Sequence, residues 1–104
     1  MTDDNDAGGF APPPFDPAAA LAALRRSARD LKLAEREGRF ELRGLPVAQA
    51  SVDGAELSVQ LARRLLRTPE WERHTLKNHA DLRRFSELLK QRLARFADAR
   101  GEDR

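Results

Sequence analysis

The sequence predicts an α+β domain of two layers, in which a three-stranded antiparallel meander is covered on one face by two helices in the order α-β-β-β-α. Three observations carry this prediction. Apolar residues recur at three- and four-residue spacing near residues 16–37 and 78–100, as in amphipathic helices. Between them, over residues 39–61, apolar and polar residues alternate, as they do in half-buried strands. The Asp53-Gly54 pair interrupts this alternation with residues that a tight β-hairpin turn prefers.

The N-terminal segment, residues 1–15, combines acidic side chains, a Gly-Gly pair and three consecutive prolines. It has too few apolar side chains to offset the entropy lost on ordering, so we expect a disordered acidic and proline-rich tail. Residues 16–104 then form a single α+β domain, as expected for a chain of 104 residues. The first 16 residues hold four aspartates and no base, so the rest of the chain carries a surplus of six bases over acids.

The first helix has a well-marked start. Asp16 is a suitable N-cap, Pro17 fits the first helical position, and Phe15 stands where a hydrophobic staple forms. The apolar face of this helix consists of Leu21, Leu24, Ala28 and Leu31.

The end of this helix has two interpretations. The helix either continues to Glu37 and ends at Gly38, which we favour slightly, or it stops near Leu31. In the second case, residues 32–36 form a strand that pairs with the next strand across the Glu37-Gly38 turn.

Two further features indicate strands. Phe40 and Leu42 alternate with charged residues and predict the first strand of the meander, after which residues 44–46 form a turn or an edge. At the hairpin we expect a two-residue loop of Asp53 and Gly54, with positive φ at both positions. The register then pairs Val52 with Ala55, Ala50 with Leu57, Ala48 with Val59, and Pro46 with Leu61. The opposite face of these two strands carries Val47, Gln49, Ser51, Glu56, Ser58 and Gln60.

Residues 63–78 fit two descriptions. Thr68 and Pro69 resemble a helix cap that would start one helical turn at Trp71, whereas residues 72–76 fit a short fourth strand equally well. The structure of this stretch stays open.

The last helix is better defined. Asn78 is a suitable cap, Asp81 lies near the positive end of the helix, and Gly101 is expected to end it. Its apolar stripe consists of Leu82, Phe85, Leu89, Leu93 and Phe96. Together with the other elements, it predicts a core that contains Leu24, Leu31, Phe40, Leu57, Val59, Phe85, Leu89 and Leu93.

Composition argues against several classes of protein. The chain has no cysteine, and therefore no disulfide and no thiolate site. It has no run of about 18 apolar residues, which a membrane-spanning helix needs. The acidic N-terminus lacks the basic and then apolar start of a secretory signal. We therefore expect a cytoplasmic protein, and the many arginines and alanines indicate a bacterial source with a GC-rich genome.

No catalytic or cofactor motif is found in the sequence. None of the four serines lies in a Gly-x-Ser-x-Gly turn, and there is no Gly-x-x-x-x-Gly-Lys phosphate loop. His74 and His79 are five residues apart, which turns them about 140° from each other on a helix and prevents a shared metal ion there. We expect no enzymatic activity, no cofactor and no bound metal.

The favoured functional hypothesis is a protein-interaction or self-associating domain. Leu65, Leu66 and Leu88 lie outside the apolar stripes, and a domain of this size cannot bury every apolar side chain. A partly exposed apolar patch with arginines at its rim is typical of a protein interface. The expected partner is another protein or a second copy of the chain, which would make a dimer.

The alternative hypothesis is a nucleic-acid-binding domain. Arg63, Arg64, Arg67 and Arg73 form a basic stretch around Trp71, whose ring is available to stack on a base. The arginines of the last helix argue less strongly. They divide between the two margins of the apolar stripe, where long basic side chains commonly cover apolar surface with their stems.

Overall fold

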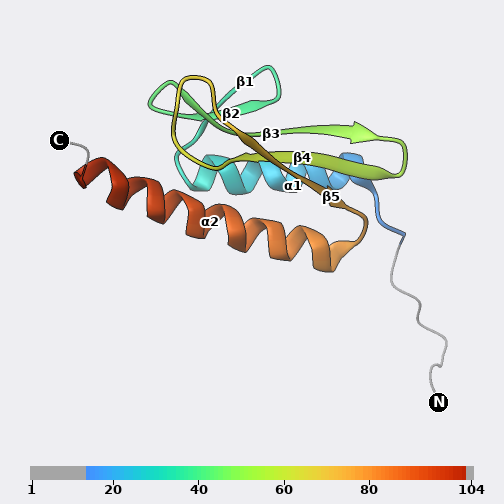
Figure 1. The fold of residues 1–104 in the computed structure, drawn as a ribbon. Coiled ribbons are helices and arrows are strands. Elements are labelled where there is room, and N and C mark those ends of the chain that lie inside the picture. The colour runs from blue at the N-terminus through green and yellow to red at the C-terminus, as the bar shows by residue number, and fades with distance from the viewer. Residues whose placement is uncertain (1–13, 103–104) are drawn as a thin grey trace, which may run out of the picture.

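The structure is a computed structural model that describes residues 14–102 (Figure 1). The elements, in chain order, are α1 (Pro17–Asp30), β1 (Ala34–Arg36), β2 (Arg39–Leu42), β3 (Leu45–Asp53), β4 (Glu56–Ala62), β5 (Trp71–Leu76) and α2 (His79–Glu102). The strands form one antiparallel sheet in the order β1-β2-β3-β4-β5, so each strand pairs with its neighbour in the sequence. Over residues 14–102, no helix combines the length and the apolar character needed to cross a membrane.

The predicted α+β class with two helices is confirmed, but the sheet has five strands instead of three. The two additional strands are the outermost ones. β1 has three residues, all of them exposed, so it lacks the apolar alternation by which a strand is recognised. In β5 the residues that face the helices include a glutamate and a histidine, so the alternation there is also weak.

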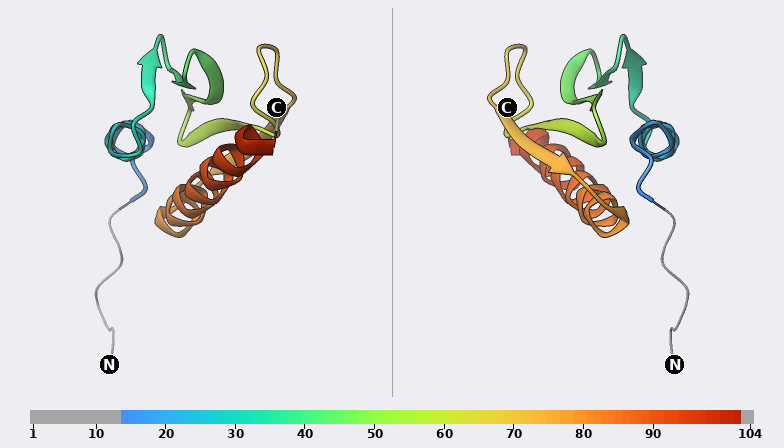
Figure 2. Two further views of the ribbon diagram at one scale, coloured as in Figure 1. Left: turned by 90° about the vertical axis from the view of Figure 1, so that its left-hand side faces the viewer. Right: turned by 90° about the vertical axis from the view of Figure 1, so that its right-hand side faces the viewer.

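Both helices pack on the same side of the sheet (Figure 1), and the sheet curves over them (Figure 2). α1 contacts β3, β4 and β1, whereas α2 contacts β5 and α1. We call the covered side of the sheet the inner face and the other side the helix-free face. The largest fully buried side chains are Phe40, Leu24, Leu57, Leu61, Leu89, Val47 and Val59.

The start of α1 agrees with its sequence. The carboxylate of Asp16 accepts hydrogen bonds from the amides of Ala18 and Ala19, at 3.0 and 3.2 Å. Phe15 packs against the core and stands edge-on to the ring of His79, with 5.7 Å between ring centroids. The predicted tail therefore does not include Phe15, and residues 1–13 of it lie outside the described residues.

The end of α1 is at the earlier of the two expected positions. The chain turns through Lys32, which has a φ of 69°. The amide of Leu33 donates to the carbonyl of Ala28, and the amide of Lys32 donates to that of Arg29. This is the Schellman pattern, which places a left-handed residue directly after a helix. The longer helix to Gly38 is therefore wrong, and the strand that pairs across Glu37-Gly38 is present as β1.

The first two hairpin turns share one geometry. Glu37 and Gly38 join β1 to β2 with φ values of 54° and 79°, and Arg43 and Gly44 join β2 to β3 with values of 54° and 82°. Positive φ at both central residues is the type I′ arrangement, whose twist matches that of the strands. Residues 45–46 consequently belong to β3 and are not a turn.

The β3–β4 hairpin differs from its predicted register. Asp53 pairs with Glu56, so the loop consists of Gly54 and Ala55. Gly54 has a φ of 61°, whereas Asp53 and Ala55 do not have positive φ, which is the type II′ pattern with glycine first. The other pairs include Val52 with Leu57, Ala50 with Val59, and Ala48 with Leu61. The predicted partners are wrong by two residues, and a shift of two leaves these residues on their predicted face.

Val47 departs from its predicted face because β3 contains a bulge. Phe40 pairs with Ala48 and Glu41 pairs with Pro46, which leaves Val47 as an extra residue. Val47 and Ala48 are consequently both buried, at 0% and 1% exposed. The predicted pairing of Pro46 with Leu61 is also wrong. Leu61 pairs with Ala48, and Pro46 pairs with Glu41 of β2.

The predicted core is largely correct. The buried members of the predicted set are Leu24, Phe40, Leu57, Val59, Phe85 and Leu89. Leu31 and Leu93 are only partly buried and pack against the margin of the cluster.

α2 starts at its predicted cap but extends beyond its predicted end. The side chain of Asn78 accepts a hydrogen bond from the amide of Asp81 at 2.8 Å, and the carboxylate of Asp81 accepts one from the amide of Lys77 at 2.9 Å. These reciprocal bonds fix the first turn. The helix includes Gly101 and reaches Glu102, so Gly101 does not end it.

Candidate binding surfaces

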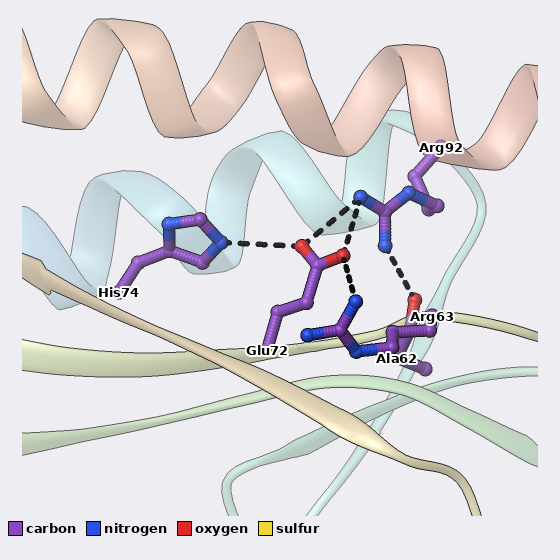
Figure 3. A network of polar contacts seen from close by, with 5 residues as sticks. All are labelled: Ala62, Arg63, Glu72, His74 and Arg92. Carbon is purple, nitrogen blue, oxygen red and sulfur yellow. Dashed lines mark hydrogen bonds and ion pairs between the residues drawn. The ribbon is translucent and has the colours of Figure 1, made fainter.

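Arg92 is buried between α2 and the sheet, with 7% of its surface exposed (Figure 3). Its guanidinium donates to the carbonyl of Ala62 at 2.8 Å and to both carboxylate oxygens of Glu72 at 3.1 and 3.2 Å. The same carboxylate lies 3.6 Å from the guanidinium of Arg63 and 3.4 Å from Nε2 of His74. These contacts attach α2 to the end of β4 and to β5.

The environment of Glu72 keeps its carboxylate ionised. Burial alone would raise the pKa of Glu72, but the hydrogen bonds and charge of Arg92, together with His74 and Arg63, lower that pKa below its ordinary value of 4.5. Through these charged hydrogen bonds the cluster anchors α2 to the sheet.

The two histidines lie in separate environments. His74 is on the inner face of β5, with its ring 5.7 Å from that of Phe85, whereas His79 contacts Phe15 at the start of α2. Within residues 14–102, no three His, Asp or Glu side chains are grouped so that they could hold a metal ion.

A hollow of about 290 Å³ lies where the outer edge of β5 meets α2. It is lined by His74, Thr75 and Leu76 from β5, and by Arg84, Phe85 and Leu88 from α2. Consecutive strand residues alternate between faces, so three in a row line one hollow only along the edge of the strand. We call the outer edge of β5 together with this hollow the β5–α2 seam.

The three leucines of the predicted interface do not form one patch. Leu88 is partly buried at the β5–α2 seam. Leu65 packs against the core, whereas Leu66 is 45% exposed in the β4–β5 loop. Leu66 lines a different hollow together with Arg64 and Glu70. The structure thus places Leu88 apart from the other two leucines.

The helix-free face carries a row of polar side chains across the sheet. Arg39 pairs with Gln49, Gln49 with Gln60, and Gln60 with Arg73, so these residues stand in line on four adjacent strands. Arg36 on β1 extends the line beyond Arg39. The side-chain amide of Gln49 donates a hydrogen bond through Nε2 to the side-chain oxygen Oε1 of Gln60. The next row consists of Ser51, Ser58 and Thr75.

The predicted basic patch is divided by the sheet. The side chain of Arg63 reaches Glu72 on the inner face. Arg64 and Arg67 are exposed in the β4–β5 loop. Trp71 and Arg73 alternate with Glu72, so they lie together on the helix-free face, where Trp71 is opposite Ala62 and partly exposed.

Sequence reasoning missed two features of these surfaces. The helical wheel places Arg92 at a margin of the apolar stripe, about 55° from its centre, with its charged head expected in water, whereas the structure buries the guanidinium. Arg39 was not connected with Arg73, because they are 34 positions apart and their alignment depends on the register of four strands.

Comparisons with known proteins give no relative. The chain matches no protein-family model, no curated protein sequence and no solved structure.

Proposed function

We propose that this protein is a non-catalytic domain that self-associates, with a second copy of the chain bound along the β5–α2 seam. The observation that carries this proposal is the position of β5. It is a six-residue strand at the margin of the sheet, and within residues 14–102 it pairs with β4 alone. A strand with one unpaired edge presents backbone donors and acceptors to another chain.

The opposite margin of the sheet is less suited to pairing. β1 has three residues, and short edge strands are one way in which proteins prevent association. At β5, by contrast, an apolar hollow runs beside the strand, and Leu88 and Phe85 contribute to it from α2. Covering Leu88 would remove from water an apolar side chain that the single chain leaves partly exposed.

In the proposed dimer, a two-fold axis perpendicular to the sheet relates the two β5 strands, and the side chains of β5 are compatible with this arrangement. Such an axis pairs residues that share a face, and it keeps the helices of both copies on one side. With the axis at His74, Arg73 of one copy stands opposite Thr75 of the other, and Glu72 stands opposite Leu76. This register opposes no like charges, which would weaken the pairing. It also brings the two α2 helices together at Leu88.

Sedimentation equilibrium of the whole chain tests this proposal. We expect a concentration-dependent dimer that Leu88→Glu shifts to monomer, because the carboxylate would be buried in the seam. Leu88→Met keeps an apolar side chain of similar size and should preserve the dimer.

Leu66→Glu is the matched control, since Leu66 is an exposed leucine outside the seam. Circular dichroism confirms that each variant is folded. A wild-type chain that remains monomeric at high micromolar concentration contradicts the proposal, as does an equal effect of Leu66→Glu and Leu88→Glu.

A further inference from the structure

A second surface lies on the other side of the sheet from Leu88. In the part of the chain that the structure describes, no helix covers the helix-free face (Figures 1 and 2). Its central row begins and ends with arginines, Arg39 on β2 and Arg73 on β5. Three strand spacings separate them, which corresponds to about 14 Å.

The charge of this row is positive. Arg39 and Arg73 are exposed, and neither makes an ion pair with another residue of the described range. Arg36 at the end of the row is 3.9 Å from Glu41, but 78% of its side chain is exposed. The acidic pair of Asp53 and Glu56 lies at the far end of the β3–β4 hairpin. Glu41 on β2 and Glu37 in the β1–β2 turn lie nearer to the row, so the excess of cations is confined to the row itself and to the β4–β5 loop beyond Trp71.

Between the two arginines lie groups that form hydrogen bonds. Gln49 and Gln60 bond to each other, and each amide keeps further donor or acceptor capacity. They line a hollow of about 270 Å³ together with Ser51 and Ser58, and Glu37 and Gly38 of the β1–β2 turn close one side of it. Amides and hydroxyls in such a position can contact the edges of unpaired bases.

Trp71 supplies a flat apolar surface at the end of this row. It lies on the same face as Arg73, two residues away, and is opposite the small side chain of Ala62. The residue packs against the core cluster and is only partly buried, so it is held in place without being enclosed. An aromatic ring beside basic side chains is the arrangement that binds single strands by stacking and by charge.

We infer that the helix-free face binds single-stranded nucleic acid across the strands, with Arg39 and Arg73 on the phosphates and Trp71 stacked on a base. Arg64 and Arg67 in the adjoining loop extend the cationic surface beyond Trp71. This binding is a function separate from self-association, because the face lies on the other side of the sheet from Leu88. A duplex keeps its bases stacked and paired, so it would offer no free base face to Trp71.

The test is a titration of a fluorescein-labelled oligothymidylate of about 12 nucleotides with the whole chain, followed by anisotropy. We expect binding at about 50 mM salt that weakens at about 200 mM salt. Arg39→Ala and Arg73→Ala should each flatten the slope of log affinity against log salt by about 0.7. Arg83→Ala is the matched control: it removes the same charge from an exposed position on α2, so the slope should not change.

Two aromatic variants separate stacking from packing. Trp71→Leu keeps an apolar side chain against the core but has no ring, and it should weaken binding by about tenfold. Trp71→Phe keeps a ring and should lose less affinity. Since Trp71 is the only tryptophan, a change in its fluorescence on adding unlabelled oligonucleotide reports contact directly.

Several outcomes would overturn the inference. They are no binding at micromolar protein in the lower salt, an effect of Arg83→Ala equal to that of Arg73→Ala, and tighter binding to a duplex of the same length. Equal competition by polyglutamate would assign the face to an acidic protein instead. Oligonucleotide binding is also measured with Leu88→Glu. We expect this monomeric variant to bind the oligonucleotide, so a failure of this inference can be distinguished from a failure of the dimer proposal.

Discussion

Arg92 connects three elements through one guanidinium, which contacts the carbonyl of Ala62 and the carboxylate of Glu72. Removing one partner of a buried charge pair is costly, because the remaining charge stays away from water without its partner. Hydropathy predicts the apolar neighbours of Arg92 in α2 but not its burial. An arginine becomes stable in a core only when a carboxylate from another element meets it, and that carboxylate is 20 residues away in the sequence.

The Glu72 carboxylate should make the free energy of unfolding depend on pH. Because its pKa is lowered in the folded protein, its contribution is present above pH 4.5 and is lost as the pH falls through the lowered value. We expect Glu72→Gln to reduce the free energy of unfolding by about 2 kcal/mol at neutral pH. The difference from the wild type should shrink as the pH falls through the lowered pKa of Glu72. Urea unfolding of the wild type and of Glu72→Gln between about pH 3 and pH 7 measures the loss at neutral pH and its change with pH.

Glu87→Gln provides the control for this prediction. The Glu87 side chain is 65% exposed and pairs with Lys90 at 3.4 Å, so its removal should change stability by less than about 0.5 kcal/mol across the range. A difference between wild type and Glu72→Gln that stays constant with pH would mean that the Glu72 carboxylate is not the titrating group.

At the scale of elements, the tight turns define the sheet. Three two-residue loops connect β1 to β4, and each contains a glycine with positive φ. The sequence identified the third of these hairpins but assigned its loop one residue too early, because Asp-Gly suits one turn type and Gly-Ala suits another. The turn or edge expected at residues 44–46 is a turn of Arg43 and Gly44, one residue earlier, and arginine is not a usual residue at positive φ.

The turn type can be tested by a pair of substitutions. Gly54→Val should lower the free energy of unfolding by about 1–2 kcal/mol, because a β-branched residue is strained at a φ of 61°. Crowding is not the cause, since no atom lies within 4 Å of an added Cβ. Asp53→Val should be neutral within about 0.5 kcal/mol, because Asp53 is a strand residue. A larger loss of stability from Asp53→Val than from Gly54→Val would instead support a loop formed by Asp53 and Gly54.

Neither the outer strand β1 nor the bulge in β3 could be predicted from hydrophobic alternation in the sequence. A strand is recognised by alternation, and alternation arises only where one face packs on a core. β1 carries Ala34, Glu35 and Arg36 and meets α1 through the ion pair of Glu35 with Arg25, so it buries no apolar side chain that would mark it as a strand. The bulge at Val47 is likewise invisible in the sequence, because a buried valine fits either face until the register with β2 is known.

At the scale of the molecule, the one-sided placement of the helices creates both proposed surfaces. Among the residues that the structure describes, it leaves one face of the sheet without a helix, and no strand pairs with the outer edge of β5. The sequence indicated Leu88, Trp71 and Arg73 individually. Their assignment to a seam and to a face required the five-strand order, because neighbours such as Glu72 and Arg73 point to opposite sides.

Self-association through β5 is tested most directly by distances between spin labels in the whole chain, which has no cysteine of its own. Thr75→Cys labels the edge of β5, and Ser51→Cys labels β3, two strands away. If two copies pair through β5, the labelled backbones of Thr75→Cys lie within about 15 Å of each other, and those of Ser51→Cys about 24 Å apart or more. No dipolar coupling at Thr75→Cys, or a shorter distance at Ser51→Cys than at Thr75→Cys, would contradict the account.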